Sequence, residues 1–296
     1  MAGLQDIRRR IRSVKNTQQV TKAMKMISAF KLRKSQERLV SLRPYAHKMS
    51  DVVRRVVSRV KVQLNGEGFV LGPAAMAFLK PREEKRIRVV LVASDKGLCG
   101  GFNANVLKKA VAFFQGRGAE TVTVDVVGKR ALEWTRKRGF PIHSEYLSVP
   151  LTGLERVSRE VSDRAAKQYM EGEIDALYVI YNEFQSAMSQ EPMVVRVFPM
   201  AEDVDRRSDA RNETAHLLEP DPNTTLEALL PRFVETEVLR TLLESSASEH
   251  GARMAAMDKA SSNAGEMIGK LTLTMNKIRQ ASITNQIIEI VSGANA

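Results

Sequence analysis

The strongest constraint on the fold is a proline-free stretch near the end of the chain. It covers residues 232–292 and is rich in good helix formers, so the sequence predicts one long helix there. At 1.5 Å rise per residue this helix would be about 90 Å long, far more than a compact domain needs. Apolar residues recur along it in steps of four and three: Ala264, Ile268, Leu271, Met275 and Ile278. The pattern predicts that a second long helix packs against it.

A matching repeat occupies the start of the chain. From Leu4 to Val60 a seven-residue repeat continues almost without interruption, although Pro44 predicts a kink. In the middle of this stretch the repeat positions are mostly polar, and apolar residues lie beside them: Val20, Met24, Ile27 and Phe30. Two interpretations stay open, a local slip of the apolar stripe or a second face that contacts a partner. Helices at opposite ends of one chain are expected to pair antiparallel, with both termini at the same end.

The middle of the chain has a different character. Continuous apolar runs such as 87–94 alternate with helical patterns, and 174–184 with 192–198 predict a hairpin. The expected fold class is therefore α/β: a Rossmann-like central domain with a long antiparallel coiled coil formed by the N- and C-terminal helices. The predicted organisation is a coiled-coil helix (1–60), a linker (61–85), the Rossmann-like domain (86–200), a second linker (201–222) and a returning coiled-coil helix (223–296).

Charge is concentrated in the first helix. The whole chain carries a formal net charge of +12, and residues 1–60 alone hold sixteen Lys or Arg against three Asp or Glu. Such a surface attracts an acidic partner, whether nucleic acid, anionic lipid or an acidic protein. The lone cysteine, Cys99, excludes an internal disulfide framework, and no apolar run reaches the length of a membrane span.

Motifs for catalysis or cofactor binding are missing from the sequence. The turn after the first strand holds Gly97, Gly100 and Gly101, but not in the spacing that binds dinucleotides, and no phosphate-binding loop occurs. The four histidines are scattered without metal-ligand spacing. We therefore expect no catalytic residue, no cofactor and no metal in this chain, and a tight turn rather than a nucleotide site.

Four long motifs stand out along the chain: DIRRRIRSVKNTQQVTKAMKMISAFKLRKSQ (6–36), SDKGLCGGFN (94–103), ASEHGARMAAMDK (247–259) and NKIRQASITNQIIEIVSGA (276–294). Together they resemble the gamma subunit of the bacterial F-type (F1Fo) ATP synthase. Their order and spacing agree with the family from end to end. The resemblance implies a non-catalytic rotor shaft that couples ion flow, expected to be proton flow, through the membrane c-ring to conformational cycling of the catalytic beta subunits.

The resemblance also implies partners and contact residues. The partners would be the hexamer of alpha and beta subunits, the epsilon subunit and the c-ring. The chain would lie peripherally at the cytoplasmic face of the bacterial inner membrane, without spanning it and without binding nucleic acid. Residues matching those that touch the hexamer are Met24, Lys25, Arg279, Gln280, Thr284, Ile287, Ile288 and Val291. In one place the chain departs from the family, because Gln286 stands where the motif usually has glutamate, which leaves that charged contact in doubt.

Two other classes of protein compete with this interpretation. A free-standing basic coiled coil that binds nucleic acid or curved anionic membrane would account for the charge, but it gives no role to the central domain. A Rossmann-type enzyme with helical arms would account for the central domain, but it requires cofactor binding or turnover by the isolated chain.

Overall fold

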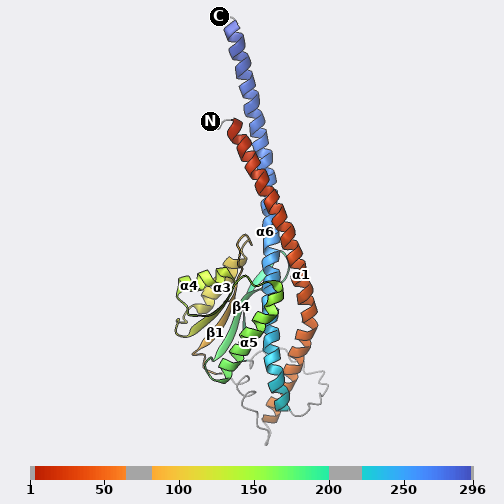
Figure 1. The fold of residues 1–296 in the computed structure, drawn as a ribbon, viewed down its shortest axis with the longest axis vertical. Helices are drawn as coiled ribbons and strands as arrows, with labels where there is room; N and C mark the ends of the chain where they lie inside the picture. Colours follow the sequence, from red (N-terminus) through yellow and green to blue (C-terminus); the bar gives the residue numbers. More distant parts are fainter. Residues whose placement is uncertain (1–3, 65–81, 200–221, 295–296) are drawn as a thin grey trace. The chain divides into compact units, whose positions relative to one another are not determined.

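The computed structural model describes residues 4–64, 82–199 and 222–294. Its contacts divide the chain into two units. The helical unit consists of Met1–Phe30 and Arg253–Ala296, and the α/β unit is Lys31–Ala252. Two long helices, α1 (Leu4–Leu64) and α6 (Pro222–Ala294), contribute residues to both units (Figure 1).

A mixed five-stranded sheet forms the centre of the α/β unit. The strands are β1 (Ile87–Val92), β2 (Val122–Val127), β3 (Ile142–Tyr146), β4 (Ala176–Phe184) and β5 (Gln190–Phe198), in the spatial order β3-β2-β1-β4-β5. The first four are parallel, and β5 returns antiparallel beside β4 as the predicted hairpin. Every residue of β1 is buried, as expected for a strand covered on both faces.

Helices cover both faces of this sheet. On one face α3 (Phe102–Phe114) and α4 (Lys129–Arg138) pack on the side chains of β1 and β2 through Val106, Ala110, Ala131 and other buried residues. On the other face α5 (Leu154–Met170), preceded by the short helix η1 (Leu151–Gly153), shares one core with parts of α1 and α6. This arrangement confirms the predicted Rossmann-like α/β class.

Strand β3 is the element that the sequence analysis missed. Its residues, IHSEY, are mostly half-exposed at the edge of the sheet, so they lack the apolar run that marks a central strand. The pairing with β2 shifts register between Val124 and Asp125, so His143 is an extra residue in β3. Such a bulge re-aims a side chain, and here His143 turns towards Asp125.

Burial along α1 follows the predicted seven-residue repeat without a slip. The polar positions Thr21, Ser28 and Ser35 are buried, whereas the apolar Val20, Ile27 and Phe30 are 57–60% exposed. The slipped-stripe interpretation is therefore wrong, and an apolar second face does exist on α1. The helix also continues through Pro44, which is exposed to solvent. Proline has no N–H to donate, so the backbone carbonyl one turn earlier loses its helical hydrogen bond, and on this exposed side it can bond to water instead.

Within the helical unit, α1 and α6 pair antiparallel. Gln18 contacts Ser261 and Lys25 contacts Asp258, so the partner number falls as the α1 number rises. On α6 of this unit, buried or half-buried side chains recur among exposed ones as far as Ile278, and from Arg279 to Gly293 every residue is exposed. Both helix ends lie at the same end of the pair, as expected, but the end of α6 continues past the first turn of α1 and does not lie beside it (Figure 1).

The predicted linkers fall mostly outside the described residues. Of the range 61–85, the structure places 61–64 in α1 and describes 82–85, while 201–221 is not described. The five predicted ranges remain a prediction.

Candidate partner-binding surfaces

The seam of the helical unit is narrow and partly polar. Gln18 Nε2 donates a hydrogen bond to the Ser261 carbonyl oxygen at 3.2 Å, and Lys25 Nζ lies 2.6 Å from Asp258 Oδ1. A Cβ atom at Gly265 would lie 3.1 Å from Gln18 Nε2, so glycine allows this close approach. Small and polar side chains here bring two helices together without a broad apolar core.

The second face of α1 contains the first two predicted contact residues. Val20, Ile27 and Phe30 expose more than half of their surface, and Met24 is half-buried beside them. Lys25 instead lies towards α6, where it forms the ion pair with Asp258. The structure thus places Met24 near an exposed apolar face and Lys25 at the seam. The sequence analysis did not identify the acidic partner of Lys25.

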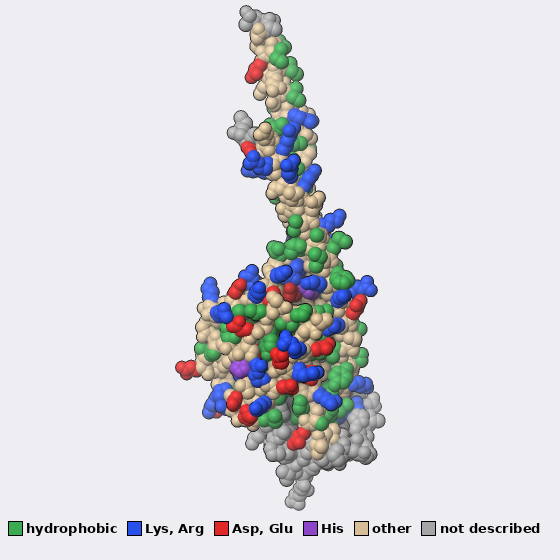
Figure 2. All heavy atoms as spheres, viewed as in Figure 1, with side chains coloured by type: hydrophobic (Ala, Val, Ile, Leu, Met, Phe, Trp, Pro, Cys, Tyr) green, Lys and Arg blue, Asp and Glu red, His purple; other side chains and the backbone are tan. Residues whose placement is uncertain are grey.

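The other six predicted contact residues lie on the exposed end of α6. Arg279, Gln280 and Thr284 are exposed, and the Thr284 hydroxyl donates to the Gln280 carbonyl at 3.0 Å, a bond within the helix. Ile287, Ile288 and Val291 are 54–56% exposed, with Ile283 and Ile290 beside them. Figure 2 shows hydrophobic side chains along this end and Lys and Arg side chains gathered on the first part of α1. A concentration of exposed isoleucines indicates a surface that a partner covers.

The turn between β1 and α3 is held by its own side chains. Asn103 Nδ2 donates to Ser94 Oγ at 2.8 Å and contacts Cys99 Sγ at 3.2 Å, while Ser94 Oγ donates to the Lys96 carbonyl at 2.6 Å. Cys99 is buried and packs with Phe102 and Ala252. The polar groups of this motif are therefore used to shape the turn and to seat it against α6.

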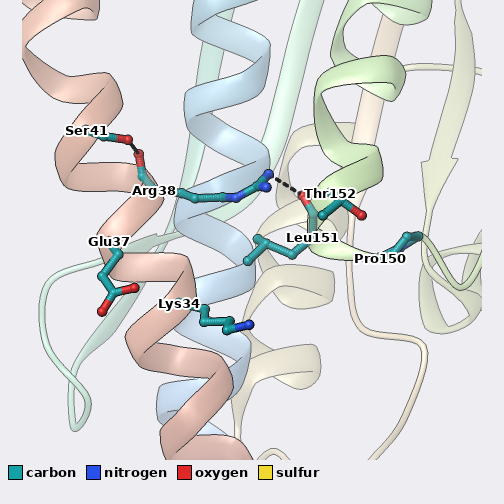
Figure 3. Close-up of a pocket in the computed structure, with 7 residues that line it drawn as sticks. All are labelled: Lys34, Glu37, Arg38, Ser41, Pro150, Leu151 and Thr152. Carbon is teal, nitrogen blue, oxygen red and sulfur yellow. Dashed lines mark hydrogen bonds between the residues drawn. The ribbon is translucent and has the colours of Figure 1, made fainter.

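A shallow depression of about 520 Å³ lies between α1 and the segment before α5 (Figure 3). Its lining residues are Lys34, Glu37, Arg38, Ser41, Pro150, Leu151 and Thr152. Arg38 Nη1 donates to the Leu151 carbonyl at 3.1 Å and lies 3.5 Å from Glu155, so its guanidinium ties α1 to η1 and α5. The lining has no nucleophile paired with a base, and the depression does not support a catalytic role.

Three titratable groups with shifted pKa values lie on neighbouring strands of the sheet, away from these surfaces. Arg88 and Asp125, both buried, approach to 3.6 Å, and His143 Nδ1 lies 3.3 Å from Asp125. Burial raises the pKa of Asp125, against the opposing effect of the Arg88 charge. Burial and the positive charge of Arg88 lower the pKa of His143. Perturbed pKa values can mark active sites, but here they follow from a buried structural ion pair.

The described residues contain neither a metal-binding cluster nor a membrane-spanning helix. Across 4–64, 82–199 and 222–294, no group of three His, Cys, Asp or Glu residues is placed to hold a metal ion. No helix within those ranges combines the length and apolar character required to cross a membrane.

Comparison with known proteins identifies the family. The family model described as ATP synthase matches residues 3–296. The chain is 45% identical over 296 residues to the ATP synthase gamma chain of Solibacter usitatus, with 100% of this chain and 99% of the relative covered. The chain belongs to the ATP synthase gamma chain family. Other gamma chains are similar over the same length, including that of Pelotomaculum thermopropionicum at 39% identity, covering 100% of this chain and 99% of that one.

Solved structures share the fold at lower identity. A chain in the central stalk and c-ring structure of Tetrahymena thermophila mitochondrial ATP synthase superposes with a TM-score of 0.59 at 22% identity, covering 82% of this chain and 99% of that one. A chain in the structure of Euglena gracilis mitochondrial ATP synthase, OSCP/F1/c-ring, superposes with a TM-score of 0.52 at 19% identity, covering 90% of this chain and 94% of that one. These two likenesses support the gamma-chain fold, and the predicted contact residues remain predictions.

Proposed function

We propose that this chain is the central rotor shaft of a bacterial F1Fo ATP synthase and is not itself catalytic. The observation that carries the proposal is the match to bacterial gamma chains over the full length of both partners. The fold supports it, because α6 ends in a long exposed helix with isoleucines on its surface, which a surrounding partner would cover.

The partners follow from the family and from the assemblies to which the fold neighbours belong. One neighbour is described as a central stalk with a c-ring and another as part of an F1 and c-ring assembly. We therefore assign to this chain the alpha and beta hexamer, the epsilon subunit and the c-ring as partners. The complex would sit at the cytoplasmic face of the bacterial inner membrane, with this chain peripheral to it.

The proposed contacts divide between two surfaces of the helical unit. Met24 would approach an acidic segment of a beta subunit from the second face of α1. Lys25 would reach the same segment only by sharing or leaving Asp258, its partner at 2.6 Å. On α6, the polar Arg279, Gln280 and Thr284 would meet hexamer loops, and Ile287, Ile288 and Val291 would turn inside an apolar sleeve.

The mechanism requires an asymmetric shaft. A ligand or partner shifts a conformational equilibrium only through different interaction free energies with the two states. The polar seam, the second face of α1 and the unpaired end of α6 present different chemistry around the helical unit. Each orientation would then favour a different conformation of each beta subunit, and rotation would supply the coupling free energy between ion flow and nucleotide affinity. The five predicted ranges fit this proposal, with 86–200 as the foot and the two end helices as the shaft.

The test is reconstitution of the whole complex in a membrane, with the alpha, beta and epsilon subunits and the c-ring, using Met24→Lys and, as a matched control, Met26→Lys. Met26 is also exposed on α1, at 67%, but it points in another direction around the helix. We expect Met24→Lys to leave the helicity of the isolated chain unchanged and to lower the yield of ATP per unit of ion flow. The added cation would strengthen attachment to an acidic segment in one orientation and slow departure from it.

Three results would count against the proposal. The isolated chain should not hydrolyse ATP, so turnover without partners would favour the enzyme alternative. Failure to assemble with alpha and beta subunits would favour the free coiled coil. Equal coupling in both lysine variants would remove Met24 from the contact surface.

A further inference from the structure

The helices on the two faces of the sheet in the α/β unit differ in charge (Figure 1). Helices α3 and α4, which cover one face, carry seven Lys or Arg and one Glu. Helix α5, on the other face, carries four Lys or Arg and three Asp or Glu. Two of its arginines are paired, Arg156 with Glu160 at 3.0 Å and Arg159 with Glu235 at 3.1 Å. Charge that served only solubility would be mixed in sign on both faces.

The cations of α3 and α4 are all exposed and form what we call the basic face: Lys108, Lys109, Lys129, Arg130, Arg136, Lys137 and Arg138. Its arginines are engaged within the chain. Arg130 lies 2.8 Å from Glu133, Arg136 lies 2.7 Å from Glu145, and Arg138 lies over an aromatic ring. No carboxylate in the described part of the chain pairs with any of the four lysines. The charge available to a partner is therefore carried by lysine.

The first residue of α4 works against the stability of that helix. α4 begins at Lys129 and has no acidic residue in its first turn. The helix dipole favours negative charge at this end, so a cation there is unfavourable. Asp95 accepts a hydrogen bond from the Lys129 backbone N–H at 3.1 Å, but it forms no ion pair with the Lys129 side chain. The folding of α4 does not explain this lysine, whereas binding to an external anion does.

Aromatic side chains lie beside the basic face. Trp134 of α4 is half-buried and stacks on Phe140 with 6.4 Å between ring centroids, and its ring centroid lies 5.6 Å from that of Phe114. The Arg138 guanidinium lies over the Trp134 ring, 5.5 Å from its centroid. An indole that is packed on one side and open to solvent on the other is typical of the boundary between water and lipid.

We propose that the basic face of α3 and α4 binds the surface of an anionic membrane through lipid headgroup phosphates. Lysine is a compact charge on a flexible stem, so a diffuse negative surface attracts it without fixed geometry. Four to eight cations in one cluster are typical of a surface that binds anionic lipid. An acidic protein would instead favour arginines free to bind carboxylates through two parallel hydrogen bonds.

The consequence for rotation rests on the proposed function. A rotor beside a membrane turns past lipids that do not turn with it, so fixed hydrogen bonds to a stationary partner would hold it back. Attraction to a layer of mobile charge allows individual lipids to exchange while the α/β unit stays near the surface. Membrane binding can be measured on the isolated chain, so its failure is distinct from failure of the rotor proposal.

The experiment uses the fluorescence of Trp134, the only tryptophan in the chain. The full-length chain is mixed with vesicles of brominated phosphatidylglycerol or brominated phosphatidylcholine. Bromine quenches tryptophan only at short range, so the signal reports contact beside the basic face and not attachment through the basic α1. Pelleting with the vesicles measures total binding in parallel.

The variants remove equal charge from two places. The test variant combines four exposed substitutions on the basic face: Lys108→Gln, Lys109→Gln, Lys129→Gln and Lys137→Gln. The matched control combines four exposed substitutions on α1: Arg8→Gln, Arg12→Gln, Lys15→Gln and Lys22→Gln. All eight positions are on helix surfaces, so both variants should fold.

We expect phosphatidylglycerol vesicles to quench Trp134 in the unmodified chain and in the control, and phosphatidylcholine vesicles to leave it unquenched. In the test variant the lipid concentration for half-maximal quenching should rise about tenfold or more. High salt should abolish the quenching, because it screens exposed charge.

Equal quenching in the test variant and the control would overturn the inference. A chain that pellets with phosphatidylglycerol vesicles while Trp134 stays unquenched would overturn it too, because α1 alone would then bind the membrane. If poly-glutamate protects Trp134 from quenching by acrylamide and the vesicles do not reach it, the basic face binds an acidic protein and the proposal is wrong.

Discussion

The same two helices are held differently in the two units. In the α/β unit, α1 and α6 share one apolar core with α5 and the sheet, and residues such as Val53 and Leu230 are almost completely buried. In the helical unit their contacts are with each other, through a seam that includes Gln18, Thr21 and Gly265. A helix backed by a sheet is anchored, whereas a helix in a narrow pair keeps much of its surface for partners. The difference matches the division between a foot and a shaft.

The largest contrast should come from removing one paired cation in each unit. Arg240→Met leaves Glu244 buried without its cation, and we expect the α/β unit to lose about 3–5 kcal/mol of unfolding free energy. Lys25→Met removes a pair whose side chains are 41% and 62% exposed, and we expect a loss below about 1 kcal/mol. Chemical denaturation of each full-length variant, followed by circular dichroism, measures both. Similar losses would show that the two units are packed alike.

A second contrast uses one substitution at two places on α6. Leu242 is 2% exposed in the α/β unit, so Leu242→Ala should create a cavity and cost about 2–5 kcal/mol. Leu271 is half-buried in the helical unit, where solvent can fill the space, so Leu271→Ala should cost about 1 kcal/mol. Hydrogen exchange resolved by segment reports each unit separately. A larger loss at Leu271 would contradict the distinction drawn between a core and a seam.

The smallest expected effect concerns pH and the sheet edge. Burial and the Arg88 charge lower the pKa of His143 in the folded chain. The unfolded chain therefore binds the proton first as pH falls through about 6.5, and stability that is present above that pH is lost below it. We expect the melting temperature of the α/β unit to fall between pH 7.5 and 5.5 and to fall less in His143→Gln. His47→Gln, at an exposed position of α1, serves as the control. Parallel curves for all three chains would refute this account of His143.

Much of the difference between the two units could be predicted from sequence, because it follows from the periodicity of apolar residues along the two long helices. The seven-residue repeat located the buried positions of α1, including polar Ser28 and Ser35. Ile287 and Ile288 at the end of α6 were instead predicted as contact residues from the resemblance to the gamma-subunit family. A local pattern carries this information because a long helix presents its faces in a fixed order.

The features that sequence did not reveal depend on contacts between distant segments. Strand β3 is half-exposed, so its residues lack the pattern of a central strand. Arg240 with Glu237 and Glu244 has the spacing of a solvated helix face, and only the packing of the sheet buries it. The partner of Lys25, Asp258, is separated from it by most of the chain. Spacing along one helix cannot indicate which face a remote segment covers.

The most direct test of the central claim is rotation. A probe is attached to the α/β unit after Lys137→Cys, an exposed position on α4, in a complex of this chain with alpha and beta subunits fixed to a surface. On addition of ATP, the account predicts that the probe turns in one direction in discrete steps, and that it stops when ATP is exhausted. Sustained ATP hydrolysis by the assembled complex with a stationary probe would contradict the claim that this chain is the rotor.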